Sequence, residues 1–162
     1  MRILVFSDTH GRYDRMIKAA ERTDFDIVLF LGACLRDFDS FCRSCPPDKM
    51  CIGVKGNCDS LDGTPEERVI TVEGKKLLML HGHTRNVKYG KDTLMYYAES
   101  IGCDIVLYGH THICDNTYVD ASNPYYMFNP GTLAGKRAPS TYGYIEIIND
   151  KIITNIVDYK EI

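Results

Sequence analysis

Five short apolar segments of this chain each run directly into a motif that contains glycine and polar side chains. The segments cover residues 3–6, 27–31, 52–54, 77–80 and 105–108. Their length and their content of Val, Ile, Leu and Phe are typical of buried β-strands. Ligands of α/β sheets bind at the carboxyl ends of the strands. We therefore expect segments that are distant in the sequence to meet at one site.

The five histidines of the chain all lie in three short motifs at these strand ends. The motifs are Asp8-Thr9-His10, His81-Gly82-His83 and His110-Thr111-His112. Each motif places two side chains that can bind a metal at positions i and i+2. In extended backbone such side chains point in the same direction, so we expect each motif to present a pair of ligands on one side.

The ligand types indicate a metal site that supports hydrolysis. Imidazoles, a carboxylate and the amide oxygen of Asn57 suit Mn²⁺, Fe, Ni or Zn²⁺, whereas structural zinc sites are usually rich in thiolates. Two metals ~3.5–4 Å apart can hold a phosphate and a hydroxide that attacks it in line. The motifs therefore predict a site for two divalent metal ions, with Mn²⁺ as the first choice.

Composition and charge narrow the class of protein. The 162 residues, 44% of them hydrophobic and 25% charged, predict one globular domain over residues 1–162. The net charge of -3 argues against a nuclease or another nucleic-acid-binding protein, because such proteins depend on clustered Lys and Arg. No apolar run approaches the ~20 residues that a membrane helix needs, so we expect no membrane partner.

The seven cysteines favour reduced thiols in a cytoplasmic protein. Their number is odd, and the first six residues are too short for a secretory signal and fit a strand better. Cys42 and Cys45 form a CxxC motif without a second one. We interpret them as small residues near a helix end, in preference to a zinc ribbon or a redox motif.

The order of apolar patterns predicts an α/β fold. Helices are expected over residues 13–21, 38–45 and 92–101. Strands are expected over residues 2–6, 26–31, 50–54, 68–72, 75–80, 104–108, 115–120, 125–128, 142–148 and 151–158, with tight turns at Glu73-Gly74 and Asn149-Asp150. The early alternation of strand and helix implies parallel or mixed pairing, and the tail implies added antiparallel strands. Two packed sheets with helices outside satisfy both.

The motifs together resemble the calcineurin-like metallophosphoesterase superfamily. The matching pieces are SDTHG at 7–11, GNCD at 56–59, HGH at 81–83, GHTH at 109–112 and NPGT at 129–132. The chain looks most like the small single-domain prokaryotic phosphodiesterase branch, which is related to the retromer scaffold subunit of eukaryotes. The resemblance covers the chain to about residue 158. It implies a four-layer α/β/β/α sandwich with two mixed β-sheets flanked by helices.

The resemblance also implies roles for individual residues. It assigns the first metal to Asp8, His10 and His112, and the second to Asn57, His81 and His110. It places Asp59 behind the metal ligands, where it would orient Asn57 or a neighbouring group. It leaves two alternatives for His83. In one, His83 contacts phosphate or transfers a proton. In the other, it only makes a supporting hydrogen bond. The NPGT segment is a type II turn that either has a structural role or lines the site.

One position departs from the family pattern. The motif after the second strand is normally Gly-Asp, with an aspartate that bridges both metals, but here Ala33 follows Gly32 and carries no ligand atom. The loss removes one negative charge and one bond to each cation. Asp37 and Cys34 remain open as substitutes, and Ala33 is compatible with either natural loss or a deliberate inactivating substitution.

A second departure concerns the leaving group. Many superfamily members place a histidine at the position of Cys58 as a proton donor. Without it, His83 is the nearby candidate for a general acid. Alkoxide leaving groups need such help more than phenoxide groups do, so aryl phosphodiesters are the easier substrates.

Two functions from different classes follow. The first is a divalent-metal-dependent phosphodiesterase that acts on small phosphodiesters or nucleotides, with activity impaired by Ala33. The alternative is a catalytically inactive binding or scaffold module on the same fold. The resemblance further leads us to expect a homodimer. The basic residues Arg85, Lys88 and Lys91 fit a solvated surface better than a substrate-steering patch.

Overall fold

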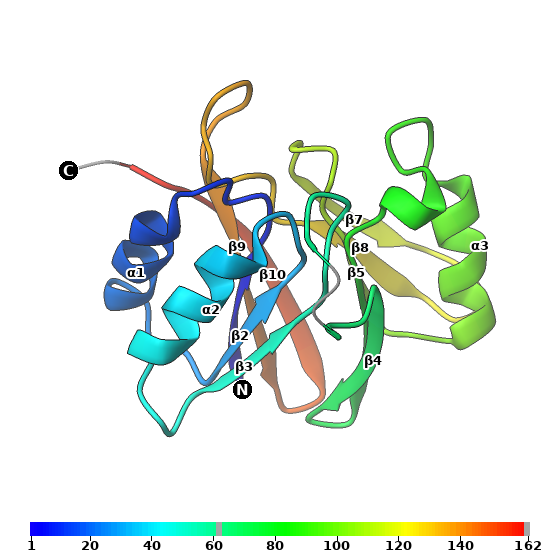
Figure 1. Cartoon of the computed structure of the whole chain (residues 1–162). Helices are drawn as coiled ribbons and strands as arrows, with labels where there is room; N and C mark the ends of the chain where they lie inside the picture. The colour runs from blue at the N-terminus through cyan, green and yellow to red at the C-terminus, as the bar shows by residue number, and fades with distance from the viewer. Residues whose placement is uncertain (61–62, 161–162) are drawn as a thin grey trace.

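The first sheet joins the beginning and the end of the chain (Figure 1). The computed structural model describes residues 1–60 and 63–160. In this sheet the strand order is β10-β9-β1-β2-β3, and the first three strands in sequence are parallel, whereas β9 and β10 add antiparallel pairs. The strands are β1 (Arg2–Phe6), β2 (Ile27–Phe30), β3 (Met50–Gly53), β9 (Thr141–Ile148) and β10 (Lys151–Asp158).

The second sheet is built from the middle of the chain. Its order is β4-β5-β6-β8-β7, with β5, β6 and β8 parallel and with antiparallel strands at both edges. The strands are β4 (Glu67–Val72), β5 (Lys75–Leu80), β6 (Ile105–Leu107), β7 (Asp115–Val119) and β8 (Tyr125–Asn129). Both sheets are therefore mixed, as the sequence pattern predicted.

The two sheets pack face to face, and helices cover their outer faces. Because side chains alternate along a strand, Ile3 and Val5 enter the core between the sheets and meet Leu77 and Leu107 of the second sheet. Leu4, on the other face of β1, packs under α1 (Tyr13–Glu21) and α2 (Leu35–Ser44). Helix α3 (Asp92–Ile101) covers the second sheet (Figure 1). This is the predicted α/β/β/α sandwich.

Burial on both faces explains why the central strands read as continuous apolar runs. Residues 3–6 and 77–80 are all fully buried. Burying one such aliphatic or aromatic side chain contributes ~1.5–3 kcal/mol relative to leaving it exposed. None of the helices in the described residues combines the length and the apolarity that crossing a bilayer requires.

The tight turns predicted from the sequence are confirmed. Glu73 and Gly74 have φ of 48° and 78°, and Asn149 and Asp150 have φ of 49° and 67°. Two consecutive residues with positive φ suit two-residue hairpins, because their twist matches that of the flanking strands. The position of the CxxC motif is confirmed as well, since Cys42 lies near the end of α2 and Cys45 caps it.

Helix α2 begins at Leu35, three residues before the predicted start. The carboxylate of Asp59 accepts hydrogen bonds from the backbone N–H groups of Cys34 and Leu35, at 2.9 and 2.8 Å. A distant carboxylate therefore caps this helix N-terminus and stabilises its first turn. The capping residue comes 24 positions later in the chain, so no local pattern revealed it.

Glycine at position 32 allows the ends of β2 and β3 to approach each other. Gly32 has φ of +91°, and a Cβ there would lie 2.5 Å from the backbone nitrogen of Gly56. Side chains rarely adopt this backbone conformation, and the facing backbone has no room to yield. The loops that follow β2 and β3 are consequently held together.

We predict that Gly32→Ala lowers the free energy of unfolding by ~2–5 kcal/mol, because left-handed strain adds to overpacking. Gly74→Ala is the matched control, since Gly74 has φ of +78° but nothing within 4 Å of its added Cβ; strain alone should cost ~1–2 kcal/mol. Urea unfolding of both variants measures the difference. Equal losses would show that the close approach to Gly56 is unimportant.

Candidate metal centre

The loops after five strands meet at one end of the two sheets. Asp8 and His10 follow β1, Asn57 follows β3, and His81 follows β5. His110 and His112 lie in the loop after β6. Backbone hydrogen bonds join these loops directly, from the Asp8 N–H to the Gly32 carbonyl at 3.0 Å and from the Gly109 N–H to the His81 carbonyl at 2.9 Å.

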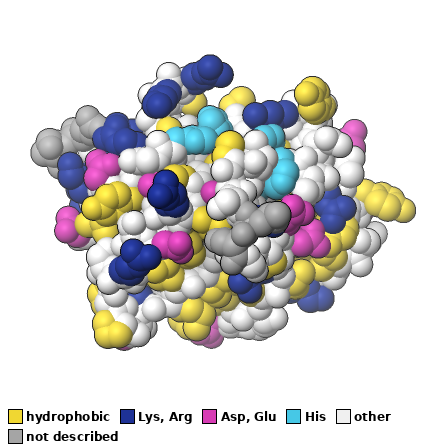
Figure 2. Space-filling view, in the orientation of Figure 1, with side chains coloured by type: hydrophobic (Ala, Val, Ile, Leu, Met, Phe, Trp, Pro, Cys, Tyr) yellow, Lys and Arg dark blue, Asp and Glu magenta, His cyan; other side chains and the backbone are white. Residues whose placement is uncertain are grey.

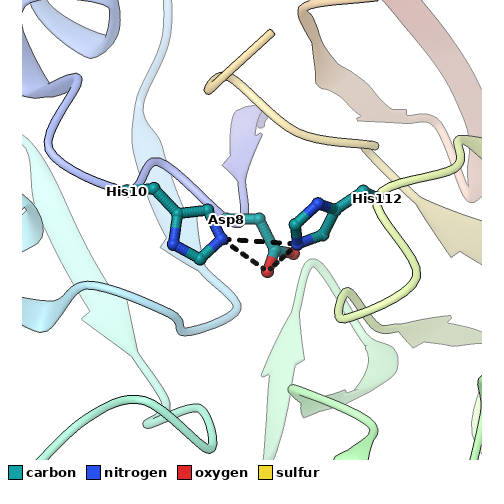
Figure 3. A group of neighbouring side chains, drawn as sticks. All are labelled: Asp8, His10 and His112. Carbon is teal, nitrogen blue, oxygen red and sulfur yellow. Dashed lines mark hydrogen bonds and ion pairs between the residues drawn. The ribbon is translucent and has the colours of Figure 1, made fainter. Parts of the chain in front are cut away.

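Asp8, His10 and His112 form the first donor group (Figure 3). The Asp8 Oδ1 atom lies 3.1 Å from His112 Nε2 and 3.7 Å from His10 Nε2. The two Nε2 atoms are 3.3 Å apart. Asp8 is buried, whereas the side chains of His10 and His112 are 32% and 33% exposed. The carboxylate side of the group is therefore buried, and the histidine side is open to solvent.

The carboxylate of Asp8 is fixed through its second oxygen. Asp8 Oδ2 accepts hydrogen bonds from Ser7 Oγ at 2.6 Å and from the His110 N–H at 3.0 Å. Burial acts to raise the pKa of Asp8, but the hydrogen bonds with His10 and His112 outweigh burial and hold that pKa below its usual range. Asp8 therefore contributes one negative charge to the first donor group.

Asn57, His81 and His110 form the second donor group. His81 Nε2 lies 3.1 Å from Asn57 Oδ1 and 3.2 Å from His110 Nδ1. The other ring nitrogen of His81 donates to the Leu31 carbonyl at 2.7 Å, which leaves the Nε2 lone pair toward the group. Asp8 Oδ1 is 3.9 Å from His81 Nε2. One carboxylate oxygen therefore faces both donor groups.

The second donor group is electrically neutral. Burial lowers the pKa of His81. Burial first, and the neighbouring His81 second, lower the pKa of His110 to about 4. Both imidazoles are consequently unprotonated at pH 7, which is the form that binds metal. Ala33 is buried and lines a cavity of about 400 Å³ beside His10, and it contributes no charge to either group.

Asp59 binds backbone and does not reach the donor groups through its own oxygens. Its carboxylate accepts N–H groups of Ala33, Cys34, Leu35 and Gly56 at 2.7–3.0 Å. These bonds lock the loop after β2 to the loop after β3. Asp59 therefore holds the segment next to Asn57, and the effect on the Asn57 side chain passes through the backbone.

His83 lies beside the second donor group but outside it. It begins the short 3-10 helix η1 (His83–Arg85), and its ring centroid is 5.5 Å from that of His81 and 6.1 Å from that of His110. Its Nδ1 atom is buried and has no hydrogen-bond partner in the part of the chain that the structure describes. An unsatisfied buried nitrogen costs free energy, so a partner at this position would stabilise the protein.

The suggested substitutes for the missing aspartate lie elsewhere. Asp37 is buried and accepts the Gly11 N–H at 2.8 Å, so it supports the loop that carries His10. Cys34 lines the cavity beside Ala33. Within residues 1–60 and 63–160, the cluster of His, Cys, Asp or Glu that could hold a metal contains neither of them.

The expectation of extended backbone in the histidine motifs is wrong. Asp8, His10, His110 and His112 have φ of 53°, 45°, 69° and 61°, which is the left-handed region. The strands end before the motifs, and a hydrogen bond from the Thr111 N–H to the Gly109 carbonyl closes a tight turn. Neighbouring histidines therefore separate: His110 joins the second group and His112 the first. Such conformations cost ~1–3 kcal/mol each and often mark functional sites.

Three supporting residues at the centre were not predicted as such. Ser7 donates to Asp8 Oδ2, and Thr132 Oγ1 donates to the Asp8 carbonyl at 2.7 Å. Asn129 Nδ2 donates to the Gly109 carbonyl at 3.2 Å and to Thr111 Oγ1 at 3.0 Å. The NPGT turn, with Gly131 at φ of 81°, was the only signal for the last two. This turn supports the loop that carries Asp8 and His10 and the loop that carries His110 and His112.

The comparisons with known proteins agree with this geometry. Residues 1–150 match the calcineurin-like phosphoesterase superfamily domain, and the chain belongs to this family. It is 27% identical to "Probable metallophosphoesterase YsnB" of Bacillus subtilis over 160 residues, 98% of this chain and 91% of that protein. Membership implies divalent-metal binding, and Asp8, His10 and His112 form the candidate site.

Solved structures show the same fold. A Streptococcus pneumoniae protein described as a predicted phosphoesterase has a TM-score of 0.75 at 26% identity, and the match covers 98% of this chain and 89% of that one. Vps29 from Entamoeba histolytica, solved as a complex with Zn²⁺, has a TM-score of 0.76 at 22% identity and coverage of 99% and 100%. The resemblance to the superfamily is thereby confirmed.

We predict that Asp59→Ala destabilises the protein by ~2–5 kcal/mol, because backbone N–H groups in two loops lose their acceptor. Asp39→Ala is the matched control, since Asp39 is an exposed carboxylate on α2, the helix that Asp59 caps; it should change stability by less than ~0.5 kcal/mol. Chemical denaturation measures both variants. A loss for Asp59→Ala no larger than that of the control would contradict the bracing role.

Proposed function

We propose that this chain is a divalent-metal-dependent phosphodiesterase whose activity is reduced by Ala33, and that small phosphodiesters or nucleotides are its substrates. The observation that carries the proposal is the pair of donor groups that face one oxygen of Asp8. Family membership makes the chain a metallophosphoesterase by descent. The count of two metals rests on the arrangement of the donors. The restriction to phosphodiesters rests on the resemblance to the small single-domain phosphodiesterase branch.

We assign the first metal to Asp8, His10 and His112, and the second to Asn57, His81 and His110. The donors fit such ions, because imidazole and oxygen ligands suit Mn²⁺, with Fe, Ni and Zn²⁺ as alternatives. When bound, two such ions supply Lewis-acid activation of a phosphate and of a water molecule. The Entamoeba histolytica Vps29 complex with Zn²⁺ supports zinc as a member of this set.

The residues around the donors have separate tasks in this proposal. Asp8 keeps its ionised oxygen toward both groups because Ser7 and the His110 N–H hold the other oxygen. Asn57 and His81 supply neutral lone pairs, and Asp59 holds the Asn57 loop. We assign proton transfer to the leaving group to His83, whose buried Nδ1 has no hydrogen-bond partner among the described residues.

Ala33 makes the two metal positions unequal. The first group has the charge of Asp8, whereas the second has only neutral ligands of its own. Attraction between a carboxylate and a cation is strong where solvent is excluded, so a neutral set holds a divalent ion less firmly. We therefore expect the first position to fill at lower metal concentration than the second.

An inactive binding or scaffold module is the second candidate. It is favoured by Ala33, which removes the bridging carboxylate while the surrounding fold is kept. Vps29 proteins are among the structures that share this fold. The two candidates differ in the metal content of the purified protein, because a module without chemistry has no need of a filled second position.

We further propose a cytoplasmic protein with one domain over residues 1–162 and a homodimeric state. The continuous core between the two sheets supports the single domain. The cytoplasmic location rests on the seven free thiols, all of which lie in the described residues. The dimer rests on the family resemblance.

We predict that Ala33→Asp raises hydrolysis of bis(p-nitrophenyl) phosphate with Mn²⁺ by at least ~100-fold, because the bridging carboxylate is restored. Metal analysis should rise from about one to about two tightly held ions per chain. Ala33→Asn is the matched control, since it adds similar bulk without charge, and it should leave both values near those of the unaltered chain. Absence of hydrolysis in both the unaltered chain and Ala33→Asp would refute the phosphodiesterase.

We predict that Mn²⁺ raises the thermal unfolding midpoint and that a chelator reverses the rise. Ligand at 100 times its dissociation constant stabilises the folded state by ~2.7 kcal/mol. Asp8→Asn should abolish the rise, because it removes the charge shared by the donor groups, and Asp39→Asn should preserve it. An undiminished rise in Asp8→Asn would place the metal elsewhere.

A further inference from the structure

We propose that the loop between β8 and β9 binds a second phosphate on the substrate through Lys136 and Arg137. The inference deepens the proposed function, and it names the substrate class as a phosphodiester that carries a further phosphate group. The term anion loop is used below for residues 134–139.

A separate cavity lies between the anion loop and the first donor group. Its volume is about 250 Å³, and its lining residues are His10, His112, Thr132, Ala134, Lys136 and Arg137. Two of them belong to the first donor group, whereas no residue of the second donor group takes part. Among the described residues, no carboxylate lines the cavity. A substrate phosphate bound between the two donor groups would therefore lie beside this cavity. The two cations would lie on the outer side of the cavity.

The two cations of the anion loop have no counter-charge within residues 1–60 and 63–160. Lys136 and Arg137 are exposed, and neither makes an ion pair or a hydrogen bond with any residue of the described part of the chain. Two other basic side chains near the site are paired, Lys91 with Asp115 at 2.8 Å and Arg85 with Glu67 at 3.1 Å. Lys88 acts on His110 of the second donor group and does not line this cavity. Unpaired Lys and Arg beside a cavity are suited to phosphate, for which Arg offers a forked pair of donors.

Figure 2 shows where these charges lie on the surface. Basic side chains gather at the top of the view, above histidine side chains, at the place where Figure 1 has the loop that joins β8 to β9. Lys136 and Arg137 line the same cavity as His10 and His112. The cations therefore stand next to the first donor group.

The base of the anion loop is anchored to the protein. Arg15 Nη1 donates to the Leu133 carbonyl at 2.6 Å and to Ser140 Oγ at 2.7 Å, so one guanidinium ties the two ends of the loop together. Gly135 has φ of +68°, and a Cβ there would lie 2.4 Å from Ser140 Oγ. A loop held at its base loses less freedom on binding than an unanchored one.

Thr132 connects the anion loop to the donor group itself. Its hydroxyl accepts the Ala134 N–H at 3.1 Å and donates to the Asp8 carbonyl at 2.7 Å. The distance from the Asp8 backbone to the start of the loop is therefore set by two hydrogen bonds through one side chain. Thr132 therefore fixes the distance between the cations of the anion loop and the metal donors. Selection of a substrate by its second phosphate requires such a fixed distance.

The second cavity that His10 lines is less suited to an anion. The cavity of about 400 Å³ beside Ala33 is lined by Arg36 together with Asp39 and Asp59. The two carboxylates repel a phosphate electrostatically. The difference in charge between the two cavities therefore orients the substrate. The second phosphate faces the anion loop, and the uncharged leaving group lies on the Ala33 side.

The test compares thymidine 3′,5′-bisphosphate with thymidine 5′-monophosphate as probes. Calorimetric binding to the full chain in Mn²⁺ should show about 10-fold tighter binding of the bisphosphate, and Lys136→Gln or Arg137→Gln should each reduce that preference about 2- to 5-fold. Lys151→Gln, an exposed cation on β10, is the matched control and should leave the preference unchanged. Higher salt should shrink the preference, because the contacts are exposed to solvent.

Two results would overturn the anion loop. One is equal affinity of the unaltered chain for both probes, and the other is a preference that survives both glutamine substitutions. Circular dichroism of the variants checks that they are folded. If the preference depends on the loop but neither the unaltered chain nor Ala33→Asp hydrolyses an aryl phosphodiester, phosphate recognition stands and the phosphodiesterase fails.

Discussion

The carboxylate of Asp8 is the contact on which the rest of the centre depends. A buried carboxylate is costly unless charge and hydrogen bonds compensate it. Here Ser7 and the His110 N–H bind one oxygen, while the other oxygen faces His10, His112 and His81. The backbone of Asp8 is tied to Gly32 as well. Loops from both sheets are thus organised around one side chain, and a bound cation would complete its compensation.

The loop that carries Ala33 is held by backbone hydrogen bonds and does not depend on the side chain at that position. The backbone at Ala33 is satisfied by Asp59, whose carboxylate also caps α2 and binds the Gly56 N–H. Removal of a ligand atom therefore leaves the loops in place and changes only the charge available to metals. A scaffold of this kind can lose its chemistry without losing its structure, which is why metal content and activity distinguish the two candidate functions.

Much of the fold follows from short-range pattern. The apolar composition of residues 3–6 and 77–80 predicts strands that are buried on both faces. The hairpins at Glu73-Gly74 and Asn149-Asp150 are predicted by two consecutive residues that tolerate positive φ. The start of α2 could not be predicted, because its cap comes from Asp59 in another loop. The bracing of the histidine loops by Thr132 was equally hidden, since it is a contact across 124 residues.

The sequence by itself determined which residues gather at the strand ends, because alternating strands and helices bring parallel carboxyl ends to one edge. The family resemblance implied how they divide into two groups, and only the tertiary structure decided the geometry of that division. Left-handed backbone at His110 and His112 sends neighbouring imidazoles to different donor groups, and a single oxygen of Asp8 faces both. The cavity that Lys136 and Arg137 line is likewise visible only in the tertiary structure. Such placements depend on loop geometry and long-range hydrogen bonds, which no local pattern encodes.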